Sequence, residues 1–190
     1  MRLALLATFV MTLCSATGIS RAADASDVTI TGDLRYRIDG EWLDGSDRRI
    51  RHRIRARIGA KSMVSEGIAL AFRLASGSAD PTSTNQTLDG GFTTKSIGLD
   101  LAYATWSGGD GSLAVTIGKM KNPLLRVGGN QIAWDGDVTP EGVAANYTIG
   151  AGFVNGAMLW VDEMSSGDDV LMYTAQAGPR LRLGESTELV

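Results

Sequence analysis

Apolar and polar residues alternate along much of this chain, beginning at residue 28. Polar residues occupy every second position up to residue 39, and the positions between them hold Val28, Ile30, Gly32, Leu34, Tyr36 and Ile38. Successive side chains of a β-strand point to opposite faces. The segment is therefore predicted to be a strand with one apolar and one polar face.

The segment 50–61 repeats the alternation and places arginine on its polar face. Its apolar positions are Ile50, His52, Ile54, Ala56, Ile58 and Ala60. The positions between them are Arg51, Arg53, Arg55, Arg57, Gly59 and Lys61. A helix would scatter these arginines around its circumference, whereas a strand points them to one side.

Six further strands are predicted from the same alternation or from short apolar runs, which gives eight in all. They are expected at 68–75, 96–106, 112–120, 143–149, 153–162 and 170–182. In the strand 96–106, the apolar face is expected to hold Ile97, Leu99, Leu101 and Tyr103, with Asp100 on the opposite face.

The predicted connections alternate in length, which is informative about topology. Short turns are expected at 64–67, 107–111, 149–152 and near Gly184, whereas 40–49, 76–94 and 121–142 are long and 163–169 is moderate. Short turns on one rim and long loops on the other are typical of an antiparallel up-and-down barrel of the outer-membrane type. The predicted fold is therefore an all-β, transmembrane β-barrel.

The apolar face decides between this barrel and a soluble β-sandwich, whose strands also alternate. It consists mainly of isoleucine, leucine, valine and alanine, with aromatic residues near strand ends at Tyr36, Trp42, Tyr103 and Trp106. Lipid accepts such a surface and favours aromatic residues at its interfaces. A sandwich would leave the arginines as an ordinary solvated but densely basic sheet face. We favour a barrel whose polar face lines a water-filled interior.

The residues predicted to line this interior lie on the polar face of the first strands and of the strand 96–106. They are Arg35, Arg37, Arg51, Arg53, Arg55, Arg57, Arg73 and Asp100.

Residues 1–22 are predicted to be a cleaved secretory signal peptide. Arg2 gives a positive start, residues 3–13 are apolar, and Ser20 and Ala22 place small residues where signal peptidase reads them. Cleavage removes the only cysteine, Cys14, and leaves 23–190 as the barrel domain. It also removes two of the 18 basic residues and none of the 21 acidic ones, so the formal net charge falls from -3 to -5. An acidic chain argues against nucleic acid as a partner.

The candidate chemical motifs are weak, so we expect no catalytic activity, no cofactor and no metal site. His52 is the single histidine, and one imidazole supports neither a zinc site nor a histidine-based triad. The glycines at 150, 152 and 156 miss the dinucleotide-binding spacing. The acidic residues between 135 and 141 lack the twelve-residue calcium-loop pattern.

Several polar motifs resemble the putative porin family of Gram-negative outer membranes. They are Gly32–Arg37 (GDLRYR), Asp47–Arg57 (DRRIRHRIRAR), Gly118–Pro123 (GKMKNP), Trp134–Gly142 (WDGDVTPEG) and the polar loop Pro81–Thr87. The resemblance implies an outer-membrane β-barrel of about twice this length that passes small hydrophilic solutes. It also implies a homotrimer that is secreted through the periplasm and contacts outer-membrane lipid.

The chain departs from this family at its end. It stops at Glu185–Val190, just as another strand begins and without the terminal aromatic residue usual for such barrels. We therefore expect an N-terminal half of a roughly 16-stranded porin. The alternative is a complete eight-stranded barrel with a structural or adhesion role, whose interior would be filled by side chains. Unpaired buried guanidinium groups are costly, which favours the wide, wet pore.

The long segment 121–142 is predicted to fold into the pore. With the N-terminus on the periplasmic side, it is the third connection on the outer rim, where general porins fold a loop inward. Its carboxylates could then face the arginines, and the alternative is an exposed surface loop. The candidates for this constriction are Lys121, Trp134, Asp135, Asp137 and Glu141. The expected solutes are small hydrophilic molecules or ions, anions among them.

Overall fold

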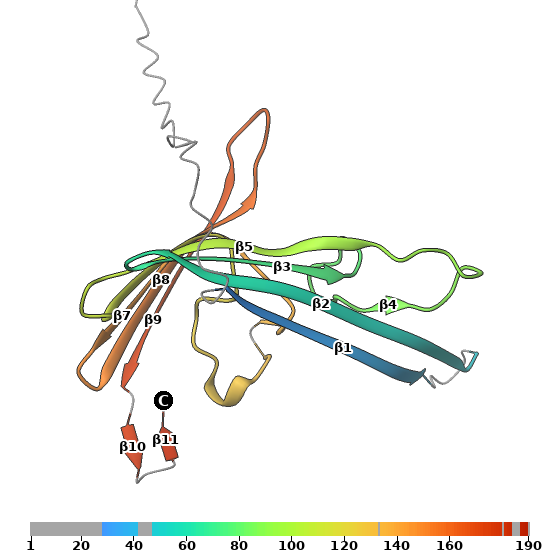
Figure 1. Cartoon of the computed structure of the whole chain (residues 1–190), viewed down its shortest axis with the longest axis horizontal. Coiled ribbons are helices and arrows are strands. Elements are labelled where there is room, and N and C mark those ends of the chain that lie inside the picture. The colour runs from blue at the N-terminus through green and yellow to red at the C-terminus, as the bar shows by residue number, and fades with distance from the viewer. Residues whose placement is uncertain (1–27, 42–46, 133, 180, 184–186, 190) are drawn as a thin grey trace, which may run out of the picture.

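The computed structural model describes residues 28–41, 47–132, 134–179, 181–183 and 187–189. The described chain is antiparallel β-structure with long connections (Figure 1). Its main strands are β1 (Val28–Glu41), β2 (Arg49–Ser65), β3 (Ile68–Ser76), β5 (Ile97–Ser107), β6 (Leu113–Lys119), β7 (Glu141–Ile149), β8 (Gly152–Asp162) and β9 (Val170–Pro179).

The minor elements are short. A two-residue strand, β4 (Gln86–Thr87), pairs with β2, and a 3-10 turn, η2, spans Val127–Gly129. Two three-residue strands, β10 (Leu181–Leu183) and β11 (Thr187–Leu189), form a separate hairpin.

The main strands form one up-and-down sheet in the order β1-β2-β3-β5-β6-β7-β8-β9. Each strand pairs with the next main strand along the chain, so there is no crossover on this path through the described strands. The sheet is open, with β1 at one edge and β9 at the other. This architecture confirms the predicted all-β, up-and-down fold.

All eight predicted strands are found, with ends that differ by a few residues from those expected. The two strands whose observed bounds differ most are β2, which extends to Ser65, and β9, which ends at Pro179. The predicted signal peptide, Trp42 and the turn near Gly184 lie outside the described residues. Short strands such as β4 carry too few residues to show a periodicity, so they were not predicted.

One face of the sheet is apolar and exposed. In β1 and β2, apolar side chains at alternate positions are more than half exposed, and Leu34 reaches 78%. They are Leu34, Tyr36, Ile38, Ile50 and Ile58. The same face continues over the later strands through Leu99, Ile117, Val154 and Tyr173. An exposed apolar surface of this extent is what lipid would cover.

A β-bulge between β3 and β5 corrects one detail of the predicted faces. Arg73 pairs with Leu101 and Leu74 pairs with Leu99, so Asp100 is the additional residue of the bulge. Leu99 is 55% exposed on the apolar face, but Leu101 is only 4% exposed and lies opposite Arg73 on the polar face. Tyr103 shares that face because it follows Leu101 by two residues. An inserted residue reverses the alternation, so the strict period of two placed Leu101 and Tyr103 wrongly.

Two facing glycines mark the base of the longest connection. Gly118 in β6 pairs with Gly142 in β7, and both have positive φ, 118° and 156°. A Cβ on Gly118 would collide with the carbonyl oxygen of Ala102, and one on Gly142 with that of Met158. Only glycine fits a backbone that approaches its neighbours this closely. The residues between β6 and β7 leave and rejoin the sheet at this point.

Candidate functional site

Arginines line the polar face of β1 and β2 in directly opposed positions. The antiparallel register places Arg35 opposite Arg55 and Arg37 opposite Arg53. Directly opposed like charges on two strands are destabilising unless other groups offset the repulsion. The next rows of the same face supply acidic partners, since Asp33 lies opposite Arg57 and Asp39 opposite Arg51.

The strand carboxylates offset part of this positive charge. Asp33 accepts from Arg57 Nε at 2.6 Å and from Arg55 Nε at 3.0 Å. Asp39 lies 2.8 Å from Arg37 Nε and 3.6 Å from Arg53 Nη1. Each aspartate therefore serves two arginines. The face keeps more guanidinium groups than strand carboxylates.

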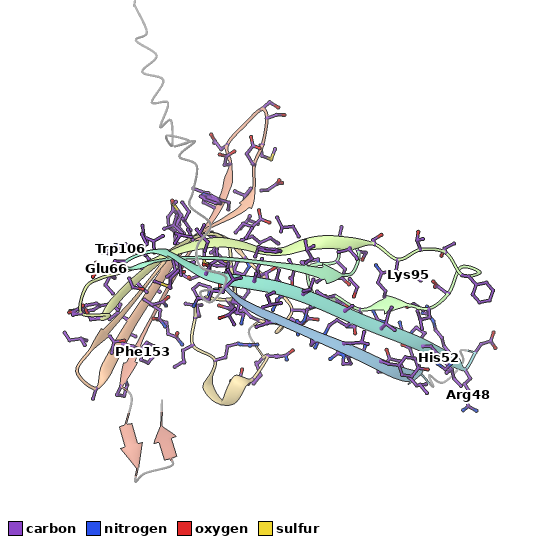
Figure 2. The ribbon with its side chains drawn as sticks, viewed as in Figure 1. Arg48, His52, Glu66, Lys95, Trp106 and Phe153 are labelled. Carbon is purple, nitrogen blue, oxygen red and sulfur yellow. The ribbon has the colours of Figure 1, made fainter. Side chains whose placement is uncertain are left out.

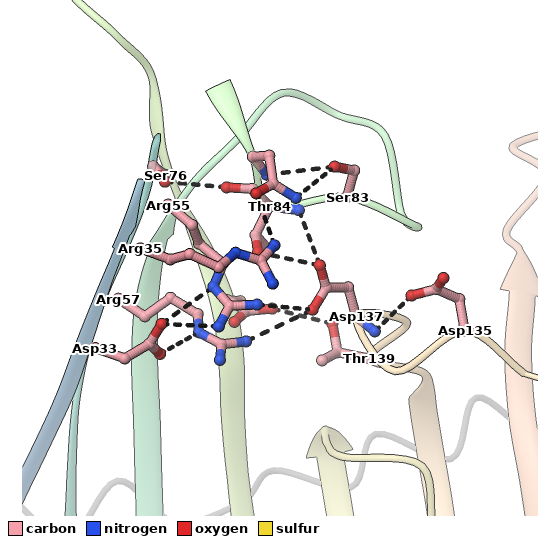
Figure 3. A network of polar contacts seen from close by, with 12 residues as sticks. Asp33, Arg35, Arg55, Arg57, Ser76, Ser83, Thr84, Asp135, Asp137 and Thr139 are labelled. Carbon is pink, nitrogen blue, oxygen red and sulfur yellow. Dashed lines mark hydrogen bonds and ion pairs between the residues drawn. The ribbon is translucent and has the colours of Figure 1, made fainter. Parts of the chain in front are cut away.

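A further carboxylate reaches these arginines from the long connection between β6 and β7. Asp137 Oδ1 lies 3.7 Å from Arg55 Nη1 and 3.6 Å from Arg57 Nη1, which is the loop-to-arginine contact seen in Figure 3. The three side chains are only 15 to 17% exposed. A shielded ion pair is less screened by salt than one on the surface. The segment 120–140 thus closes over the polar face of β2.

A second connection, residues 77–96, also folds onto the arginines, and this was not expected. Arg35 Nη2 donates to Asn85 Oδ1 at 2.7 Å, and Arg53 Nη2 donates to the carbonyl of Asn85 at 3.3 Å. Ser76 fixes the base of the connection by accepting from Ala56 N and donating to the carbonyl of Thr84. Thr84 Oγ1 donates to Asp137 at 3.3 Å, so the two connections touch (Figure 3).

The sequence of residues 77–96 contains polar groups that could contact the arginines, but it does not indicate that this connection folds onto them. The run Pro81–Thr87 is polar and uncharged, which is typical of any exposed loop. Its amide and hydroxyl groups become informative only once the arginines that they contact are known.

The bulge aspartate forms a separate pair on β3 and β5. Asp100 Oδ2 accepts from Arg73 Nε at 2.5 Å and its carboxylate is 7% exposed. Thr139 Oγ1 donates to the other oxygen at 3.5 Å. Both members were predicted to share the polar face, and the structure places them in contact.

The opposite end of the same face carries amides in place of arginines. Gln176 in β9 accepts from Leu125 N at 2.8 Å and donates to the carbonyl of Leu125 at 2.9 Å. Asn146 in β7 donates to the carbonyl of Pro123 at 3.0 Å and to Asn155 Oδ1 at 2.8 Å. Asn155 in β8 connects to Gln176 at 3.3 Å. These three amides hold the first part of the long connection.

The long connection therefore crosses the polar face and is attached at both ends. Its residues 123–125 bond to β7 and β9, and its residue 137 pairs with β2. Figure 1 shows this segment in yellow on one side of the sheet, between the long strands β1 to β5 and the group β7 to β9. We call residues 120–140 the crossing loop.

The other predicted loop residues occupy different positions. Asp135 accepts from the backbone nitrogen of Asp137 at 2.8 Å, and Trp134 is half-buried. Glu141 pairs with Lys119 at 2.9 Å at the base of the loop, and no contact with an arginine is recorded for it within the described residues. Lys121 is exposed. Of the three loop carboxylates, the structure brings Asp137 to the arginines.

Several arginine nitrogens on the polar face lack a partner. Among the described residues, the Nε atoms of Arg35, Arg51 and Arg53 are buried without a hydrogen-bond acceptor. A guanidinium N–H must be satisfied by an acceptor, so these atoms are available to water or to another acceptor.

The predicted outer-face residue His52 pairs with Tyr36. His52 Nδ1 and the Tyr36 hydroxyl lie 2.6 Å apart, and Figure 2 shows His52 near the far end of β2. Over the described residues, no three acidic, histidine or cysteine side chains gather in a way that could hold a metal ion. The described helical segments include none long and apolar enough to cross a membrane.

Comparison with known proteins identifies the family of this chain. No curated protein matches the chain significantly. A family model described as a putative porin matches residues 41–189, which is most of the chain. This span includes the arginine strand β2, the crossing loop and the amide strands β7 to β9. Membership in such a family implies a channel protein of the outer membrane, and this chain belongs to the putative porin family.

Proposed function

We propose that the polar face and the crossing loop form the wall and the constriction of a water-filled outer-membrane channel. The channel passes small hydrophilic solutes by passive diffusion and works without catalysis. In the full-length protein the barrel is completed by further strands and assembles as a homotrimer. The N-terminal segment 1–22 directs export and is removed.

One observation carries this proposal: the crossing loop lies on the arginine face, while the opposite face of the same strands is apolar and exposed. In a soluble β-sandwich the apolar side would be covered and the arginines would face bulk water. Here the polar side is the sheltered one, with Arg55 and Arg57 15 and 17% exposed beneath Asp137. This inversion fits a barrel with lipid outside and water inside.

The arrangement of charge supports solute selection by the channel. A positive wall that faces a loop carboxylate creates a field across the conducting path, which orients dipolar solutes and raises the local anion concentration. Arginine suits this role because it stays charged and its planar fork matches carboxylate and phosphate.

The alternative function is a complete small barrel with a structural or adhesion role. Such a barrel would need β1 to pair with the last main strand, β9. Within the described residues no such ladder is present, and these two strands form opposite edges. The observations therefore favour the porin.

The test measures reversal potential in planar lipid bilayers across a salt gradient. Neutralising the wall in the full-length protein with Arg53→Gln, Arg55→Gln and Arg57→Gln should shift the reversal potential toward cation preference, most strongly at low salt. Asp137→Asn should shift it in the opposite direction. Lys95→Gln removes a cation that is paired with Asp89 outside the arginine face and serves as the control.

Two outcomes would contradict the proposal. A protein that inserts into the bilayer but conducts no current is not a diffusion channel. If neither the triple arginine substitution nor Asp137→Asn changes the reversal potential, the conducting path does not run along the arginine face.

A further inference from the structure

A cavity of about 420 Å³ lies between the crossing loop and the wall of β2 and β3. It is separate from the contact of Asp137 with Arg55, because neither of those residues lines it. Its charged lining consists of Arg57, Arg73, Lys121, Arg126 and Asp135. Four cations and one carboxylate around a cavity of this size suggest a site for a negatively charged solute.

The two wall arginines are already partly neutralised. Arg57 pairs with Asp33 and Asp137, and Arg73 pairs with Asp100. Arg57 and Arg73 make one side of the cavity positive, but carboxylates outside the cavity offset part of their charge.

The two loop cations have no such partner within the described part of the chain. Lys121 is exposed, and Arg126 Nη1 is buried without a hydrogen-bond acceptor. A buried guanidinium nitrogen without an acceptor is costly, and an anion in the cavity would remove that cost.

The remaining lining is partly apolar. Leu124, Leu125 and Val138 are half-buried and face the same cavity. A bare inorganic ion gains nothing from aliphatic side chains, whereas an organic acid can place its carboxylate on the cations and its hydrocarbon part on the leucines.

We propose that this cavity is a binding subsite for small organic acids that carry a carboxylate and a short apolar body. The proposal rests on the channel function proposed above and names its solute class. Arg126 and Lys121 hold the carboxylate, and the leucines of the crossing loop contact the apolar body. Asp135 opposes binding because it brings a like charge into the same space.

The experiment uses single channels of the full-length protein in planar bilayers with potassium chloride. Acetate, butyrate and benzoate share one charge and differ in apolar size, and inorganic phosphate supplies charge without an apolar body. The measured quantity is the concentration of each anion that halves the chloride current. This concentration should fall from acetate to butyrate to benzoate, and phosphate should block less well than benzoate.

The variants separate the roles of charge and of the leucines. Lys121→Gln and Arg126→Gln should each raise the half-blocking concentration of benzoate by about tenfold, the effect of losing one charge-assisted hydrogen bond. Asp135→Asn should lower it. Lys95→Gln, outside the cavity, should leave it unchanged. If Arg126→Gln does not assemble, the exposed Lys121 still decides the question.

The outcomes distinguish the subsite from the channel itself. An absence of chloride current in the unmodified protein would overturn the proposed function. A normal chloride current with equal block by all four anions, or a benzoate block that Lys121→Gln leaves unchanged, would overturn the subsite alone.

Discussion

The two ends of the polar face hold the crossing loop by different chemistry. At β1 and β2 the contacts are ionic, between Asp137 and the guanidinium groups of Arg55 and Arg57 at 3.6 to 3.7 Å. At β7 to β9 they are neutral hydrogen bonds at 2.8 to 3.0 Å, made by Asn146 and Gln176 to backbone atoms of the loop. The contacts at β7 to β9 are therefore shorter than those at β1 and β2.

This difference shows how one loop can be held in a fixed position and also contribute to the electrostatic field across the polar face. Neutral hydrogen bonds to backbone groups depend on geometry and are little affected by salt. Charge pairs create the field across the face, but salt weakens them. The amides therefore fix where the loop lies, and in the proposed channel the arginines and Asp137 would determine the charge that a solute meets.

The largest expected effect is a loss of stability caused by a charge on the exposed apolar face, which the strands at both ends of the sheet share. Ile58 in β2 is 57% exposed and Ile117 in β6 is 51% exposed. Ile58→Arg and Ile117→Arg should each destabilise the protein in lipid by about 2–4 kcal/mol near the bilayer centre. Urea titration of the refolded protein in lipid vesicles measures this, with Arg55→Ala on the inner face as the tolerated control. Equal losses on both faces would mean that inside and outside are reversed.

The next effect breaks the amide end. Gln176→Leu keeps the approximate size of the side chain but leaves the N–H and C=O of Leu125 without their partner. The loss should be about 1–3 kcal/mol, since the two backbone groups would stay unpaired in a half-buried position. Hydrogen exchange at the Leu125 amide should accelerate equally at low and high salt. Protection of that amide that survives the substitution would show that Gln176 does not hold the loop.

A smaller effect is expected at the ionic end. Asp137→Asn removes the charge that faces Arg55 and Arg57 and should cost about 1 kcal/mol at low salt. Exchange of the amides in residues 135–139 should accelerate in dilute buffer, and the difference from the unmodified protein should shrink at 1 M salt, where the Debye length is about 3 Å. If the difference in exchange rate does not depend on salt, the attachment at β1 and β2 is not ionic, and the two ends hold the loop by similar chemistry.

The smallest effect lies in a short turn away from both ends, at Asp110. The backbone N–H and the hydroxyl of Ser112 donate to Asp110 Oδ1 and lower the pKa of this carboxylate from its usual value. Because the folded-state pKa is lowered, the turn is stabilised above the unfolded pKa and loses this contribution as pH falls through the folded pKa. Ser112→Ala should raise the pKa of Asp110 toward its ordinary range, as followed by carboxyl NMR titration. The opposite shift would contradict this assignment.

The strands and the polar face could be predicted because alternation is a local property. Each arginine of β2 lies two residues from the next, so its face follows from the sequence alone. The bulge at Asp100 could not be predicted, because one inserted residue leaves no mark in the pattern. It moved Leu101 and Tyr103 to the polar face.

The attachment of the crossing loop was only half predictable. A carboxylate opposite an arginine wall is suggested by charge, which singled out Asp137 together with Asp135 and Glu141. The three amides Asn146, Asn155 and Gln176 carry no charge, and consecutive members lie 9 and 21 residues apart in the sequence. Nothing local therefore distinguishes them from other polar residues. Their signal was their shared polar-face position, which needs the strand register to be recognised.

The amide attachment also affects the order of folding. Leu125 bonds to Gln176 in β9, which follows it by 51 residues, so this contact forms only after β9 has joined the sheet. Until β9 joins the sheet, the crossing loop is held only by contacts to strands already present. We therefore expect a folding stage in which the crossing loop is held by β2 and β7 but not yet by β9. The insertion of β9 then completes the attachment of the crossing loop, so the position of this loop depends on the pairing of β8 with β9.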